Sequence, residues 1–138
     1  MGPRALAGST ASLALVGGLI GSANPTRNAV ESLLFTPTSG DQSVGAVDLS
    51  QVGARVTYID EVRAYHLPVG HWSATWRKGQ GPLLDHGERV EIEVTLQSLY
   101  PPLGPGTRFS IRVQAGRGSV LVIDRTTPEK FQAIMDIQ

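Results

Sequence analysis

Three histidines are the residues of this sequence best suited to chemistry. His66 and His71 lie five residues apart across a segment with proline and glycine, and His86 lies in a second turn. Structural zinc sites commonly combine imidazole with cysteine thiolates, and this chain has no cysteine. A spacing of five also places His66 and His71 on no common helical face. The sequence therefore predicts no metal site, and His86 fits a turn in which Gly87 supplies the permissive backbone.

The sequence contains no motif for nucleophilic catalysis or for phosphate binding. Serine, histidine and aspartate all occur, but no serine stands in a GxSxG elbow and no Walker-type loop is present. Neighbouring charges such as Asp124 with Arg125, or Glu61 with Arg63, are typical of solvated strand ends. We expect a protein that is not an enzyme and has no cofactor.

Two tryptophans carry the remaining potential for binding. Trp72 and Trp76 are four residues apart in HWSATWRK, so on a strand they share one face. Their average burial favours a place in the core. Exposed together, rimmed by Arg77 and Lys78, they would instead form a subunit contact or a carbohydrate-stacking surface.

The composition indicates a β-rich chain without a charge-selected partner. Twelve basic and twelve acidic residues give a formal net charge of zero, so nothing marks nucleic acid or anionic lipid as a partner. Only 17% of the 138 residues are charged, and glycine and proline together number 25, from 16 and 9. Such a composition favours a loop-rich β protein, whose stability must come from packing because disulfides are excluded.

The N-terminal region divides at about residue 12. Met1 to Ala11 is small and turn-prone, and we interpret it as a disordered terminus or a cloning remnant preceding a single domain over 12–138. The apolar run Leu13–Gly21 is too short to span a bilayer, so we expect no membrane insertion. The run reads as a strand, although its position after Arg4 also has the outline of a signal peptide ending at Ala23.

The elements that would position these residues are short strands with turn signals about ten residues apart. We predict strands at Leu13–Ile20, Val30–Thr36, Ala54–Asp60, Glu61–His66, Trp72–Arg77, Glu88–Leu99, Thr107–Gln114 and Val120–Ile123. Turns fall at Asn24–Asn28 and Pro37–Asp41, Val47–Val52 is a turn or a helical loop, and Phe131–Ile137 is a helix or an edge strand. This pattern indicates an all-β, two-layer antiparallel sandwich, immunoglobulin-like in the broad sense, with a small barrel as second choice.

Two segments alternate most clearly. In ERVEIEVTLQSL and TRFSIRVQ, apolar residues alternate with polar ones at period two, which predicts one buried and one wet face. The wet faces carry opposite charges. If the two strands pair, Glu91 and Glu93 would lie across from Arg112 and Arg108 and help to set the register.

The last predicted strand, GSVLVID, ends in the tetrapeptide RTTP. Thr126 and Thr127 suit extended backbone, whereas Pro128 removes a donor, so the strand should stop there. RTTP also closes an ordered series: VDLSQV, ARVTYID, LLDHGERVEIEVTL and LGPGTRFSIRVQAGRGSVLVIDRTTP. From about Val47 to Pro128 this series resembles the C-terminal half of an archaellin, the major subunit of the archaeal motility filament.

The resemblance implies both a fold and a role. Archaellins resemble type IV pilins, with a basic leader, a hydrophobic helix that packs in the filament core and an outer β-sandwich. Nothing in Met1 to Ala11 resembles that helix, so the chain matches the outer sandwich alone. The resemblance implies an extracellular structural subunit that packs against copies of itself or related archaellins. Many archaellins are heavily glycosylated, whereas this chain has no N-x-S/T acceptor, because Pro25 follows Asn24.

Subunit contacts are the sites that this role requires. Our candidates are Trp72, Trp76 and three residues of the PPLGPG loop, Pro101, Pro102 and Leu103. A second hypothesis is a stator or adaptor module of the same motor that binds the surface layer. A third is a secreted carbohydrate-binding module that uses the two tryptophans.

Overall fold

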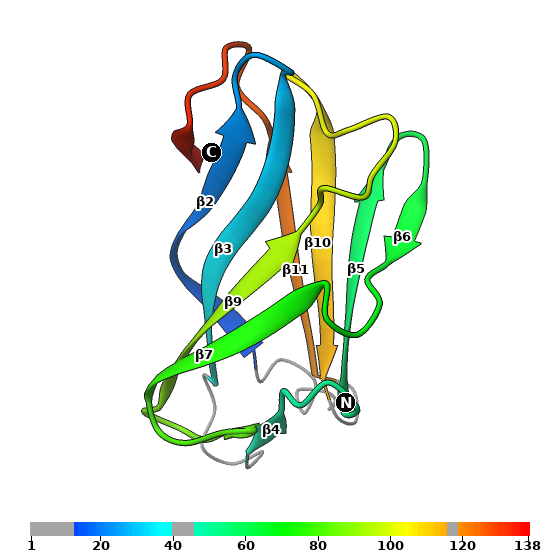
Figure 1. Ribbon diagram of the computed structural model, residues 1–138. Helices are drawn as coiled ribbons and strands as arrows, with labels where there is room; N and C mark the ends of the chain where they lie inside the picture. Colours follow the sequence, from blue (N-terminus) through cyan, green and yellow to red (C-terminus); the bar gives the residue numbers. More distant parts are fainter. Residues whose placement is uncertain (1–12, 40–45, 116–118) are drawn as a thin grey trace, which may run out of the picture.

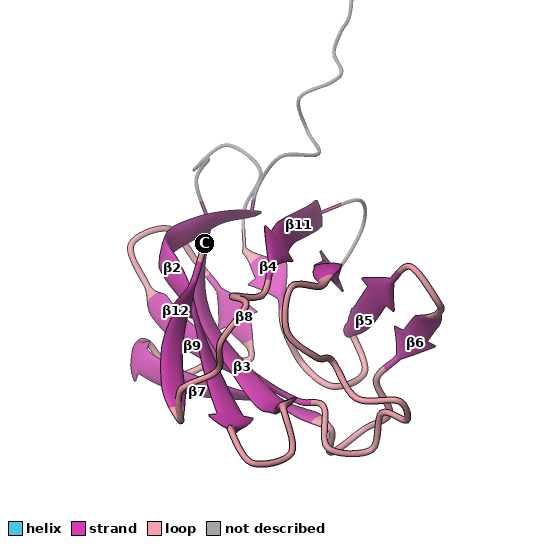
Figure 2. Ribbon diagram, turned by 90° about the horizontal axis from the view of Figure 1, so that it is seen from above, coloured by secondary structure: helices cyan, strands magenta, loops and turns pink. Residues whose placement is uncertain are grey.

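Two antiparallel sheets face each other in the computed structural model, which describes residues 13–39, 46–115 and 119–138 (Figures 1 and 2). One sheet has five strands in the order β12-β2-β3-β9-β7, and the other has four in the order β11-β10-β5-β6. A two-stranded ribbon, β4-β8, lies at one end. The strands are β2 (Leu13–Asn24), β3 (Ala29–Ser39), β4 (Val47–Asp48), β5 (Ala54–Asp60), β6 (Ala64–His66), β7 (Trp72–Lys78), β8 (Leu83–Leu84), β9 (Arg89–Thr95), β10 (Arg108–Ala115), β11 (Ser119–Thr126) and β12 (Ile134–Ile137).

The predicted fold class is confirmed, and the period-two segments explain why. In β9 and β10 the apolar positions are buried and the polar positions between them are half-buried or exposed. Inward residues from both sheets join one hydrophobic core, in which the rings of Tyr58 and Phe109 stack with centroids 6.1 Å apart. Alternation on two sheets thus buries one face of each against the other.

The two alternating strands, whose pairing the sequence left open, do not pair with each other. β9 pairs with β3 and β7 in the five-stranded sheet, whereas β10 pairs with β5 and β11 in the other. Two of the four charges are paired within their own sheet instead: Arg77 Nε lies 2.8 Å from Glu91 Oε1, and Arg108 Nη2 lies 2.9 Å from Asp124 Oδ2. Period two sets the faces of a strand but does not select its partner.

The neighbouring strands β12, β2 and β3 test three predictions made for the two ends of the chain. The run from Leu13 forms a strand, β2, with an irregularity between Val16 and Ile20 where Gly17 has a φ of 72°. The strand β3 continues through Pro37, where it still pairs with β2. The pairing of β3 with β9 ends before this point, at Phe35, so the N–H that proline lacks is not needed for a bond to β9. The tail, for which helix and strand were both open, forms β12 against β2.

The remaining predictions fall on the ribbon and the terminus. Within Val47–Val52, β4 pairs with β8 before the chain turns into β5. Residues 37–39 of the predicted turn Pro37–Asp41 belong to β3 instead. Residues 40 and 41, like the proposed terminus at 1–11, lie outside the described residues. No helix in the described part of the chain is long and apolar enough to cross a membrane.

Candidate subunit-contact surface

The two tryptophans share the inward face of β7 and do not form an exposed pair. Trp72 is 3% exposed within the core, and Trp76 packs partly buried against the same core. Gly81 covers the Trp76 indole so closely that a Cβ there would lie 2.1 Å from Nε1. The core interpretation of the tryptophans is confirmed. Trp72 is therefore not available to a neighbouring subunit, and the pair offers no platform for sugar stacking.

The loop between β9 and β10 presents only part of the predicted PPLGPG surface. Leu103 is 1% exposed, and its carbonyl oxygen accepts a hydrogen bond of 3.0 Å from Val30 N–H at the start of β3. Pro102 is half-buried, and Pro101 is exposed. Leu103 is thus an anchor, so the surface candidates that remain in this loop are Pro101 and, in part, Pro102.

Thr127 of the RTTP segment fastens this loop to the end of β11. Its side chain is buried, and Oγ1 donates a hydrogen bond to Gly104 O at 2.7 Å and accepts one from Thr107 N–H at 2.8 Å. Two backbone hydrogen bonds reinforce this contact: Thr127 N–H donates to Thr107 O, and Gly106 N–H donates to Pro128 O. A serine or threonine hydroxyl can both donate and accept, so this position uses that capacity to hold the loop.

Arg63 holds the same loop from the other side. Its guanidinium forms a 3.2 Å ion pair with Asp60, lies over the Tyr58 ring at 5.9 Å and donates a hydrogen bond to Pro101 O. Tyr58 Oη donates to Asp60 Oδ2 at 2.6 Å, and burial together with this bond raises the pKa of Tyr58. Partial burial by itself raises the pKa of Asp60, but the hydrogen bonds from Tyr58, Val62 N–H and Arg63 hold it below its ordinary value.

The two loops joined by Arg63 expose an apolar tip, which consists of Val62, Tyr100 and Pro101. Tyr100 is 91% exposed and Val62 is 74% exposed. Both belong to the end of the sandwich that carries the β2–β3, β5–β6 and β9–β10 connections (Figure 1). We did not predict Tyr100 or Val62 from the sequence, although a tyrosine directly before two prolines in a loop has few ways to be buried.

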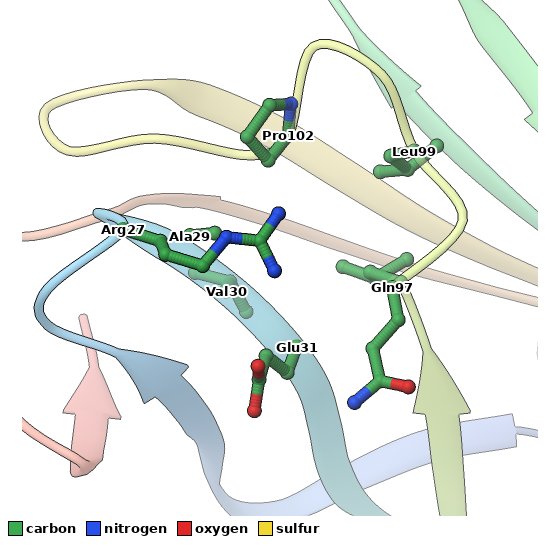
Figure 3. Close-up of a pocket in the computed structure, with 8 residues that line it drawn as sticks. Arg27, Ala29, Val30, Glu31, Gln97, Leu99 and Pro102 are labelled. Atoms are coloured by element: carbon green, nitrogen blue, oxygen red, sulfur yellow. The ribbon is translucent and has the colours of Figure 1, made fainter.

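A recess of about 290 Å³ opens beside Pro102. Its apolar wall comes from Ala29, Val30, Leu96 and Leu99, and its polar groups are Arg27, Glu31 and Gln97. Figure 3 shows the Arg27 side chain extending across the recess, with Pro102 and Leu99 on one side and Glu31 on the other. A recess with both charge signs and an apolar wall can receive a protruding side chain of a neighbouring protein.

The histidines lie apart from this surface chemistry. His66 Nδ1 lies 3.0 Å from Thr57 Oγ1, and His71 Nδ1 lies 3.5 Å from Tyr65 Oη. The described residues contain no group of three or more histidines and carboxylates placed to hold a metal ion.

Comparison with solved structures places the fold among archaellum proteins. The archaeal flagellin FlaB1 of Methanocaldococcus jannaschii matches with a TM-score of 0.76 at 14% identity, over 91% of this chain and 96% of that chain. The archaeal flagellum of Methanospirillum hungatei matches with a TM-score of 0.70 at 19% identity, over 93% of this chain and 71% of that chain. The periplasmic stator protein FlaG of Sulfolobus acidocaldarius matches with a TM-score of 0.56 at 13% identity, over 76% and 91%.

At the level of sequence, no protein-family profile and no curated protein matches this chain. At identities below 20%, the structural similarity concerns the fold. The resemblance inferred from the series that ends in RTTP is confirmed in that sense, because the two archaeal flagellar structures share the fold of this chain.

Proposed function

We propose that this chain is the outer domain of a subunit of an archaeal motility filament, with a structural rather than a catalytic role. The observation that carries the proposal is the similarity to two archaellins over more than 90% of the chain, at TM-scores of 0.76 and 0.70. The sequence series that closes on RTTP supports it independently, since Thr127 has a defined structural task here.

The domain would act through surface complementarity between subunits. The apolar tip of Val62, Tyr100 and Pro101 is the strongest candidate contact, because large exposed apolar side chains gather there on loops that are held in place. The recess beside Pro102 would accept side chains from the neighbour. Partners are copies of this chain or related archaellins, and the location is the extracellular filament.

A stator or adaptor role is the second candidate, because the stator protein FlaG and the FlaF–FlaG complex share the fold at a TM-score of 0.56. In that role the chain would act at the cell envelope, and the surface layer would be its partner. The lower similarity favours the filament over the stator.

Immunogold labelling of the source cells distinguishes the two roles. Antibodies against the purified chain should decorate sheared filaments along their whole length if the chain is a filament subunit. Labelling confined to the cell envelope or to the filament base would overturn the proposal in favour of the stator. Filaments prepared from a strain that lacks the gene provide the control for antibody specificity.

A further inference from the structure

The outer faces of the two sheets differ in their unpaired charges. They point away from each other on opposite sides of the sandwich (Figure 2), so each is available to a different neighbour. On each face one ion pair is already internal: Arg77 with Glu91 on the five-stranded sheet, and Arg108 with Asp124 on the four-stranded sheet. The charges that remain decide what each face can contact.

The five-stranded sheet presents two carboxylates around an apolar pair. Asp136, Ile20, Leu34 and Glu93 are consecutive register partners across β12, β2, β3 and β9. Ile20 is 37% exposed and Leu34 is 36% exposed, and Ile134 on β12 is 64% exposed nearby. Among the described residues neither Glu93 nor Asp136 forms an ion pair. Besides Arg77, which is paired with Glu91, the basic strand residues of this sheet are Lys78 and Arg89, which lie opposite each other at the far end of β7 and β9.

The four-stranded sheet presents arginines around apolar residues. Arg112 lies between its register partners Val122 on β11 and Thr57 on β5, and Arg55 lies two residues from Thr57 on the same face. Val122 is 55% exposed. In the described part of the chain Arg55 and Arg112 have no ion-pair partner. Among the described strand residues of this face Asp124 is the one acid, and it is paired with Arg108, so the unpaired charge that these strands carry is positive.

We infer that the four-stranded face of one copy packs against the five-stranded face of the next, with Arg55 and Arg112 opposite Glu93 and Asp136. Either face against itself would bring like charges together, which costs affinity, whereas opposite faces bring unlike charges around matching apolar residues. Such a contact is heterologous, and heterologous contacts that do not close generate helical filaments. The inference rests on the proposed function and adds which surfaces of the domain meet.

Cysteine cross-linking tests this arrangement cleanly, because the native chain contains no cysteine. The variants are Leu34→Cys on one face, Val122→Cys on the other and the double variant, each treated with a short bis-maleimide at high protein concentration and low salt. A heterologous contact should give a ladder of covalent oligomers from the double variant and dimers from a mixture of the two single variants. Each single variant alone should remain monomeric.

Dimers from each single variant alone would overturn the inference, since they mean that each face meets itself. A ladder from the double variant therefore supports the inference only when each single variant stays monomeric. A double variant that stays monomeric would also overturn it. The matched control is Val52→Cys with Val69→Cys, two exposed positions outside both faces, which should give no ladder. Adding the charge reversals Arg55→Glu and Arg112→Glu to the double cysteine variant should remove the ladder. If immunogold labelling decorates the filaments but cross-linking gives no ladder, the proposed function stands and only the assignment of the two faces is rejected.

Discussion

Two regions predicted as contacts, the β7 tryptophans and the β9–β10 loop, have opposite positions in the folded chain. The tryptophans lie on the inward face of β7, and Trp72 is 3% exposed. The loop carries Tyr100 at 91% exposure and is held by Thr127 and Arg63. The difference shows that aromatic residues on the inward face of a strand serve the core, whereas an aromatic residue in an anchored loop can stay exposed.

We expect the largest loss of stability from a substitution at Trp72, in the buried region. Replacing Trp72 with alanine removes a fully buried indole and should lower the free energy of unfolding by about 3–5 kcal/mol. Trp76→Ala removes a partly buried indole, so its cost should be clearly smaller. Urea unfolding followed by circular dichroism measures both. Equal small losses would show that Trp72 is not in the core.

The anchor of the loop should respond next. Thr127→Val keeps the shape but leaves Gly104 O and Thr107 N–H without their hydroxyl partner, at a cost of roughly 1–3 kcal/mol. Hydrogen exchange of the Gly106 and Thr107 amides should accelerate more than exchange in β9. Thr127→Ser, which retains the hydroxyl, is the control and should keep both amides protected. Unchanged exchange in the valine variant would contradict the anchoring role.

The Asp60 network predicts a dependence on pH. Because the pKa of Asp60 in the folded chain lies below its ordinary value of 3.8, its contribution to stability is present above that pH and is lost as the pH falls through the folded value. Asp60→Asn should cost about 1–2 kcal/mol at neutral pH, where it weakens the bonds to Tyr58 and Arg63. The difference between wild type and variant should shrink as the pH falls below 3.8 and through the lowered pKa of Asp60. A difference that does not change with pH would rule out ionised Asp60 as its source.

The smallest effect on stability is expected at the apolar tip. Tyr100→Ser removes a side chain that is 91% exposed, so the free energy of unfolding should change by less than about 0.5 kcal/mol. Filament formation in cells should nevertheless weaken if the tip is a contact. Val52→Ser, at a site 96% exposed and away from the tip, is the matched control. Normal filaments with Tyr100→Ser would move the contact elsewhere.

The sandwich was predictable because strand alternation and turn residues carry it. The boundaries Ala54–Asp60 agree fully with β5, and the predicted strands over 107–114 and 120–123 fall on β10 and β11. Strand partners were not predictable, because Glu91 and Glu93 fit any basic strand equally well and the core packing decides. Spacing placed Trp72 and Trp76 on one face but did not say which face, and the recess at Arg27 depends on loops distant in sequence.

Cryo-electron microscopy of filaments from the source cells tests the central claim most directly, since a helical reconstruction at side-chain resolution identifies its own subunit. The account predicts an outer density that fits this sandwich, with Trp72 inside it and Tyr100 and Pro101 against a neighbouring subunit. Filaments whose outer density fits a different sequence, with this chain absent from the preparation, would contradict the account.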